Sequence, residues 1–165
     1  MTSPHPAFTE FDRALGEAST ADDAWAAIHK LTVETVGGRL FSVMLADWDA
    51  KVSSRVYTTH PEEYPLSGTK PFNPSHWWQV IHTERKPFVA NTLEEIAEVF
   101  PDPDLIGSLG LGSVINIPVV LNNRIAGTLN VLDAEHFYTP ERAAAASLLM
   151  LPGKAACLAA TVLSE

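Results

Sequence analysis

The sequence predicts a single α+β domain in which helices cover both sides of an antiparallel β-sheet. Two runs rich in β-branched residues flank Asn122-Asn123 within residues 113–132, a pattern typical of a β-hairpin. Two helical segments precede the first expected strand, and a long helix rich in Ala and Leu follows the hairpin. Because 165 residues is the length of one ordinary domain, residues 1–165 are expected to form one unit.

The composition is that of a folded globular protein, with 46% hydrophobic and 19% charged residues. The net charge is −9, and the eleven Lys and Arg residues are scattered along the chain. Nucleic acids and anionic membrane surfaces both require clustered basic residues, so neither is expected as a partner.

Cys157 is the only cysteine, which excludes a disulfide framework and a thiolate metal cluster and indicates a reducing compartment. Residues 1–7 have neither the basic nor the apolar region of a signal peptide. No apolar run is expected to approach the length needed to cross a bilayer. These observations predict a cytoplasmic protein.

The N-terminal half is predicted to hold two helices followed by two strands. Residues 7–18 form the first helix, and Thr20 caps the second, whose first turn carries Asp22 and Asp23. Gly37-Gly38 would end it, and residues 40–46 and 52–59 are the predicted strands. Four prolines within residues 60–74 predict a stiff loop without regular structure.

A third helix is expected after this loop, with Asn73 as its cap and Trp77 and Trp78 within it. A short strand is predicted near residues 88–90, and Thr92 with Glu95 would form a capping box for a further short helix.

Prolines 101 and 103 would end that short helix. Residues 139–141, Thr-Pro-Glu, are typical of a helix start, and Pro152-Gly153 is expected to kink or interrupt the C-terminal helix.

The length of the hairpin loop decides which side chains share a face, because side chains alternate along a strand. A two-residue loop would place Asn116 on one face and Thr128 with Asn130 on the other. A three-residue loop is favoured because it leaves one apolar face for helices, with Gly127 allowing close approach. That face would hold Ile115, Ile117, Val119, Ile125, Leu129 and Val131, and the opposite face Val114, Asn116, Ala126, Thr128 and Asn130.

Three hydrogen-bonding side chains would then gather on one face of central strands. Buried polar groups cost roughly 1–3 kcal/mol each unless they are paired. Asn116, Thr128 and Asn130 therefore indicate either a lined cavity or a network in which they satisfy one another and nearby backbone groups. Both interpretations stay open at this point.

Residues 117–142, IPVVLNNRIAGTLNVLDAEHFYTPER, resemble the GAF domain family: a strand near a proline, a tight turn, an (I/A)-G-x-L strand, and Phe before a capped helix. With the preceding helices and strands, the resemblance covers nearly the whole chain. It implies a GAF/PAS-like, profilin-like antiparallel sheet of five or six strands with the N- and C-terminal helices on one face. A pocket would lie over the other face, beneath residues 60–110, and homodimers would form through the terminal helices.

Three branches of that family carry features that this sequence lacks. Free methionine sulfoxide reductases use cysteines above the pocket, and acidic residues where this chain has Val114, Asn130 and Leu132. Bilin attachment, as in phytochromes, needs a suitably placed cysteine, whereas Cys157 lies in the terminal helix, and the N-K-x-D-type signature of cyclic-nucleotide binders is missing. The resemblance thus implies a stand-alone ligand-sensing domain without a cofactor.

The expected ligand contacts come from the polar face of the sheet and from the loop above it. Arg55 and Tyr57 alternate with Val56 and would form a side wall, while Lys70 would lie in a lid. Trp77 and Trp78 are about 100° apart on a helix, so one would face the pocket and the other the core. The candidate ligand-binding residues are Ser42, Met44, Arg55, Tyr57, Lys70, Trp77, Asn116, Thr128 and Asn130.

A ligand carboxylate could meet Arg55, Lys70 and the helix N-terminus at Ser75-His76. The plain alternatives are a solvated edge-strand charge for Arg55 and a surface lysine for Lys70. His76 and His82 point to different sides of their helix, so no metal site is expected.

No nucleophile–base pair is evident, so no catalytic residue is assigned. The leading hypothesis is a small-molecule sensor that acts on another protein or through a dimer. An enzyme for a small polar metabolite is the first alternative, favoured if two titratable groups lie within hydrogen-bonding reach in a closed cavity. The second is a dimerisation or partner-binding module whose pocket is filled by Trp77, Trp78 and Met44.

Overall fold

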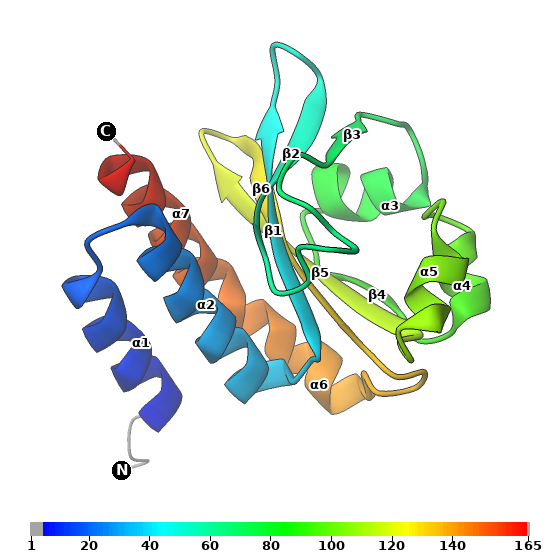
Figure 1. The fold of residues 1–165 in the computed structure, drawn as a ribbon, viewed down its shortest axis with the longest axis horizontal. Coiled ribbons are helices and arrows are strands. Elements are labelled where there is room, and N and C mark those ends of the chain that lie inside the picture. The colour runs from blue at the N-terminus through cyan, green and yellow to red at the C-terminus, as the bar shows by residue number, and fades with distance from the viewer. Residues whose placement is uncertain (1–4, 165) are drawn as a thin grey trace.

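The computed structural model describes residues 5–164, so the first four residues of the N-terminal segment discussed above lie outside the described part. Its centre is a six-stranded antiparallel sheet in the order β3-β2-β1-β6-β5-β4, with helices on both faces (Figure 1). This is the α+β fold that the sequence predicts. The strands are β1 (Leu40–Asp47), β2 (Val52–Thr58), β3 (Thr69–Pro71), β4 (Phe88–Ala90), β5 (Ser113–Leu121) and β6 (Arg124–Asp133).

The terminal helices form the layer on one face, as expected. Helix α1 (Pro6–Glu17) packs on α2 (Ala21–Val36), and α2 packs on α7 (Met150–Leu163), which also contacts β5 (Figure 1). The Thr20 side chain accepts a hydrogen bond from the Asp23 amide at 3.1 Å, and the Asp23 carboxylate accepts from the Thr20 amide at 3.0 Å. This reciprocal cap fixes the start of α2 at the predicted residue.

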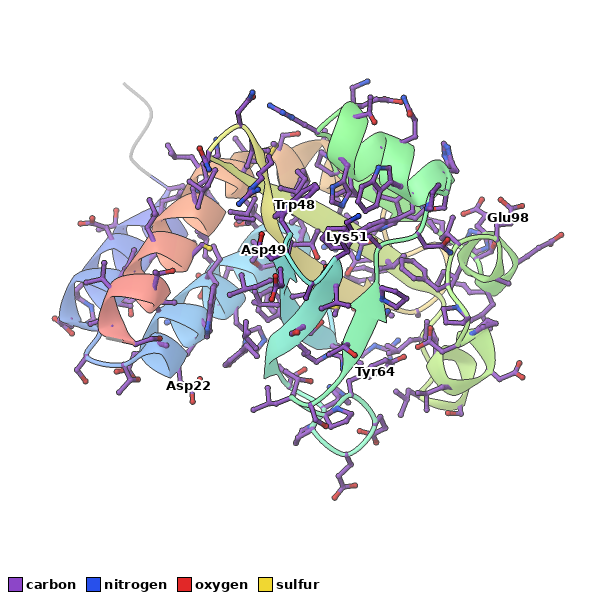
Figure 2. All side chains as sticks on the ribbon, turned by 90° about the horizontal axis from the view of Figure 1, so that it is seen from above. Asp22, Trp48, Asp49, Lys51, Tyr64 and Glu98 are labelled. Carbon is purple, nitrogen blue, oxygen red and sulfur yellow. The ribbon has the colours of Figure 1, made fainter. Side chains whose placement is uncertain are left out.

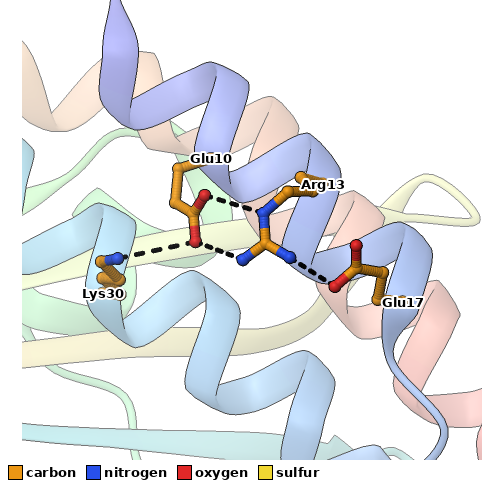
Figure 3. A network of polar contacts seen from close by, with 4 residues as sticks. All are labelled: Glu10, Arg13, Glu17 and Lys30. Carbon is orange, nitrogen blue, oxygen red and sulfur yellow. Dashed lines mark hydrogen bonds and ion pairs between the residues drawn. The ribbon is translucent and has the colours of Figure 1, made fainter.

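Figure 3 shows how charged side chains join α1 to α2 at the surface. Arg13 bonds Glu10 at 2.7 Å and also bonds Glu17, and Lys30 of α2 lies 3.6 Å from Glu10. The Arg13 hydrogen bond lowers the pKa of Glu10 to about 2. Because all four side chains are exposed or half-exposed, the network orients the helices and adds little stability.

The other face carries short elements, several of which differ from expectation. Ser75, not Asn73, caps α3 (His76–Trp78), which continues as a π-helix (Gln79–Thr83). The proline-rich loop, predicted to lack regular structure, contains the short strand β3. Pro71 is tolerated in this strand because β3 lies at the edge of the sheet, where no further strand requires the missing N–H. Thr92 caps α4 (Leu93–Ala97) as predicted. The predicted capping box is incomplete, because the Glu95 carboxylate accepts a hydrogen bond from the Asn91 amide and not from the Thr92 amide. Pro103 begins α5 (Pro103–Ser108).

The C-terminal helix begins at α6 (Pro140–Ala145) with Thr139 as its cap, as predicted. A 3-10 segment, Ala146–Leu149, interrupts it just before Pro152, whose missing N–H disfavours regular α-helical hydrogen bonding there. Gly153 is buried in α7, and a Cβ added to it would lie 3.2 Å from the Leu129 side chain. The helix thus approaches the sheet closely at Gly153.

The C-terminal helical run also corrects one expectation about length. Pro140–Leu163 has 24 residues and contains an 18-residue window with a mean hydropathy of 1.6, so by length and composition alone it could cross a bilayer. Its inner side packs on β5 and α2. Its outer side leaves four large apolar residues exposed: Leu148, Leu151, Leu158 and Val162.

The hairpin loop has two residues rather than three. Asn122 and Asn123 have φ values of 52° and 56°, the left-handed pair of a type I′ turn. A β-bulge then changes the register: Val120 pairs with Ile125 and Val119 with Gly127, which leaves Ala126 unpaired.

Because of this bulge, the residues of β6 after Ala126 lie on the faces predicted for them, whereas Ile125 and Ala126 lie on the opposite faces from those predicted. Asn116 pairs with Asn130, and Thr128 lies on their face, as predicted. Ile125 belongs to the cluster on the pocket side and Ala126 packs against the helix-side core, so both of those placements were wrong. The unpaired residue Ala126 shifts the alternation of β6 by one position, as a third loop residue would have done.

Candidate functional site

A cavity of about 490 Å³ lies over the polar face of the sheet, beneath the α3–α5 region and beside β3. Its lining includes five side chains that the sequence assigned to the pocket floor, and these come from β1, β5 and β6: Ser42, Met44, Asn116, Thr128 and Asn130. The floor residues therefore lie where they were predicted, and their contact with a ligand stays a prediction.

The polar floor residues also bond to one another. The Trp77 indole donates to the Asn116 carbonyl oxygen at 2.8 Å, and the Asn116 amide donates to Asn130 at 2.7 Å. Asn130 in turn donates to the Ser42 backbone oxygen at 3.4 Å. The lined cavity and the internal network, the two interpretations of this face, are both present. The chain of bonds holds Trp77 in place over the sheet.

Arg55 and Tyr57 lie on opposite faces, contrary to the expected alternation. Met44 pairs with Arg55 while Val43 pairs with Tyr57, so Val56 is the extra residue of a bulge between β1 and β2. Arg55 lines the cavity, but Tyr57 packs against Phe41 and places its hydroxyl 3.5 Å from His29 Nδ1 in the helix layer. The placement of Tyr57 in the pocket wall was wrong.

Arg55 is buried, with 7% of its surface exposed, at one end of the cavity. Its Nη1 donates to the Pro65 carbonyl at 3.0 Å, its guanidinium lies over the Tyr64 ring, and its Nε is buried with no partner among residues 5–164. Burial lowers the pKa of Arg55. The expectation of a solvated edge charge does not describe this side chain.

Lys70 reaches the same end of the cavity from β3, because β3 pairs with β2 through Ser53–Lys70 and Ser54–Thr69. Its ammonium lies 5.2 Å from the centre of the Phe100 ring. Burial lowers the pKa of Lys70, the Arg55 charge lowers it further, and Asp102 opposes both. Lys70 is therefore a partly buried strand residue rather than a lid residue.

Tyr64 and Asp102 complete this end of the cavity, and neither was among the residues predicted from the sequence to line it. The Tyr64 hydroxyl donates to Asp102 Oδ2 at 2.7 Å, and both residues line the cavity. Figure 2 shows Tyr64 on the loop between β2 and β3. The only sequence signals were an aromatic residue in a proline-rich loop and an aspartate between two prolines, and neither pattern is specific.

Another part of the cavity lining is aromatic. Trp77 and Trp78 both line the cavity, where one of them was expected in the core. His82 stacks on Trp78 with ring centres 3.6 Å apart, and it lies in the π-helical segment that follows Trp78. Burial lowers the pKa of His82 to about 4, so the ring is neutral at pH 7.

Within residues 5–164, no three His, Cys, Asp or Glu side chains gather in a way that could hold a metal ion. Cys157 is buried in α7, and burial raises the pKa of its thiol. The described lining of the cavity combines charged side chains, a few polar ones and many apolar or aromatic ones.

Comparison with known proteins agrees with this architecture. The sequence model described as GAF domain matches residues 11–152, most of the chain. The chain belongs to the GAF domain family. This family consists of small-molecule-binding sensory domains in signalling proteins. No curated protein sequence matches the chain significantly.

Solved structures of GAF domains share the fold at low sequence identity. The GAF domain of a phosphoenolpyruvate-protein phosphotransferase from Coxiella burnetii has a TM-score of 0.75 and 13% identity, covering 97% of this chain and 96% of that one. The GAF domain of a two-component sensor histidine kinase from Bacillus halodurans has a TM-score of 0.69 and 15% identity, covering 90% of this chain and 100% of that one. A GAF domain/HD domain protein from Geobacter sulfurreducens gives 0.67 and 14%, with 91% and 97% covered.

Tyr64 and Asp102 are the one pair of titratable groups in this GAF domain's cavity within hydrogen-bonding distance, as far as residues 5–164 describe it. Burial and the Asp102 bond raise the pKa of Tyr64 well above its usual value. A general acid or base works best with a pKa near the working pH. Tyr64 therefore serves as a fixed hydrogen-bond donor that orients Asp102.

Proposed function

We propose that this GAF domain binds a small organic molecule in the cavity over its sheet and acts as a sensory domain. The supporting observation is the open volume of about 490 Å³ bounded by rigid strands. That volume lies inside the range of about 300–1,000 Å³ typical of small-molecule sites. A few polar side chains converge on it, and most of the remaining lining is apolar or aromatic.

The two alternatives fit the cavity less well. A collapsed pocket requires Trp77, Trp78 and Met44 to fill the space, whereas all three line an open cavity. An enzyme is favoured by the proximity of Tyr64 and Asp102, yet the raised pKa of Tyr64 makes it a poor proton donor or acceptor at neutral pH. Binding without turnover is the simpler account of this site.

Native mass spectrometry of the purified protein tests the proposal. We expect the wild-type chain to retain a metabolite from its host, and Ala46→Trp, which fills the cavity from β1, to lose it. Ala26→Trp adds the same ring to the exposed side of α2 and should retain the metabolite. If neither wild-type protein nor the control retains a metabolite, and no compound in a metabolite panel raises the melting temperature, the proposal fails.

We also propose that this GAF domain forms a cytoplasmic homodimer through α7, which would pass the signal to a partner protein. Leu151, Ala155, Leu158 and Val162 of α7 follow spacings of four, three and four residues, and Leu148 of the preceding 3-10 segment lies three residues before Leu151. This is the heptad spacing of a coiled-coil seam, and two copies of one seam complement each other about a two-fold axis. The four large side chains are 53–75% exposed in the single chain.

Light scattering after size-exclusion chromatography tests the dimer. The double variant Leu151→Glu/Leu158→Glu should be a monomer, because two charges in each copy would face each other across the seam. Leu66→Glu alters an equally exposed leucine in the loop before β3 and should leave the dimer intact. A wild-type protein that stays monomeric over a roughly 100-fold range of protein concentration would rule out this interface.

A further inference from the structure

The cavity has a cationic end whose hydrogen-bonding capacity is largely unused. Arg55 is 7% exposed, and one of its donors, Nη1, bonds the Pro65 carbonyl while Nε has no partner within the described residues. No carboxylate of residues 5–164 lies within ion-pair distance of Arg55 or Lys70. Because a buried cation without a partner is unfavourable, this end of the cavity favours an anion.

The surroundings hold the Arg55 guanidinium in one place. The Arg55 amide bonds the Gly68 carbonyl at 3.0 Å, and a Cβ added to Gly68 would overlap Nη1. The Tyr64 ring covers the guanidinium at 5.1 Å. A fixed, planar guanidinium binds a carboxylate through two parallel hydrogen bonds, whereas Lys70 adds a second positive charge without such directionality.

Nearby acidic groups limit the charge that this end of the cavity would accept. Asp102 is bonded to Tyr64, and its charge acts on both Arg55 and Lys70. Glu98 also lines the cavity but is exposed, and Figure 2 shows it at the end of the molecule formed by α4 and α5. With Asp102 partly compensating two cations, a singly charged ligand group fits this end better than a dianion.

The rest of the cavity suits a flat apolar body. Trp78 and His82 form a stacked pair at one wall, and the Phe72 ring centre lies 5.2 Å from the Trp78 ring centre. The His82 ring is uncharged at pH 7. Trp77 is held over the floor by its bond to Asn116. Aromatic walls of this kind favour ligand rings through stacked or edge contacts.

From this arrangement we infer that the cavity takes a monocarboxylic acid with an aromatic or cyclic apolar body, its carboxylate bound by Arg55 and Lys70 and its ring by the Trp78–His82 wall. This inference rests on the proposed function, because it names the class of molecule that the sensory site would bind.

Isothermal titration with matched probes tests the ligand class. The probes are benzoate, phenylacetate and indole-3-acetate, the primary amide of each, phenyl phosphate, and acetate. We expect at least one aromatic acid to bind at least tenfold more tightly than its amide and than acetate. Equal affinity for acid and amide, preference for phenyl phosphate, or no binding by any aromatic acid would overturn the inference.

Two variants locate the charge contact. Arg55→Gln and Lys70→Met should each weaken binding of the acid at least tenfold and leave binding of the amide unchanged. Lys86→Met removes an exposed lysine paired with Glu84 and should change neither affinity. If Arg55→Gln does not fold, as judged by circular dichroism, Lys70→Met decides the result. If amides bind and a neutral metabolite is retained, the acid class fails while the sensory function stands.

Discussion

The stack of His82 on Trp78 ties the protonation of one side chain to the stability of the fold. The folded-state pKa of His82 is about 4 against an ordinary value of 6.5, so the unfolded chain binds the proton first as the pH falls. Above pH 6.5 both states are neutral and the stabilisation is complete. It is lost progressively between pH 6.5 and 4.

We therefore predict that wild-type protein loses about 1 kcal/mol more unfolding free energy than His82→Phe between pH 6.5 and 4, a value reduced for the partial exposure of the ring. Urea denaturation at several pH values measures the difference. His136→Asn, at an exposed left-handed position, serves as a control and should follow the wild-type pH dependence. Parallel curves for wild type and His82→Phe would contradict the prediction.

The hydrogen-bond chain on the pocket floor makes a second prediction at the residue scale. Asn116→Ala leaves both the Trp77 indole N–H and the Asn130 carbonyl oxygen without their partners. We expect the free energy of unfolding to fall by about 1–3 kcal/mol, measured by chemical denaturation. Asn73→Ala, at an exposed position, should change it by less than about 0.5 kcal/mol. A similar change in both variants would show that the chain adds no stability.

At the scale of elements, Gly127 determines how closely β6 approaches β1. A Cβ at this position would overlap the Met44 carbonyl oxygen and crowd Leu45, both in the neighbouring strand. The close approach predicted for Gly127 is therefore to a strand, and Gly153 of α7 provides the close contact between helix and sheet.

Gly127→Ala should lower the free energy of unfolding by about 1–3 kcal/mol, because the strand backbones cannot separate without breaking the ladder. Gly16→Ala is the matched change in α1, where an added Cβ meets nothing within 4 Å. That variant should be stabilised by about 0.5–1 kcal/mol, since alanine favours helix over glycine. Thermal denaturation should therefore show a lower melting temperature for Gly127→Ala and a higher one for Gly16→Ala. Equal shifts in the two variants would contradict the role given to Gly127.

Two bulges decide which of the predicted strand residues face the cavity. Alternation along β2 places Arg55 and Tyr57 together, and the extra residue Val56 separates them. The same device at Ala126 offsets the even hairpin loop. A bulge depends on which residues of two strands are hydrogen-bonded, so the alternation pattern of one strand does not reveal it.

At the scale of the whole molecule, the proposed ligand binding would be linked to the protonation of Lys70. The pKa of Lys70 is lowered by burial and by Arg55, with Asp102 opposing and Tyr64 hydrogen-bonded to Asp102 at the same end. A bound carboxylate would favour charged Lys70, so the complex takes up a proton once the pH exceeds the lowered pKa of the free protein.

The affinity for an aromatic acid should therefore fall as the pH rises through that range, before an exposed lysine would titrate. Titration calorimetry in buffers of different ionisation enthalpy measures the proton uptake directly. Lys70→Met should abolish the uptake, and Lys86→Met should preserve it. Uptake that persists in Lys70→Met would assign the proton to another group.

The sequence by itself determined the fold class, the capped starts of α2 and of the C-terminal helix, and the membership of Asn116, Thr128 and Asn130 in one polar face. These features follow from local propensity and from the alternation of neighbouring residues. Only the tertiary structure decided that Tyr57 leaves the pocket and that Tyr64 and Asp102 join Arg55. The physical reason is that register shifts and loop closure depend on contacts between residues distant in sequence, which no local pattern contains.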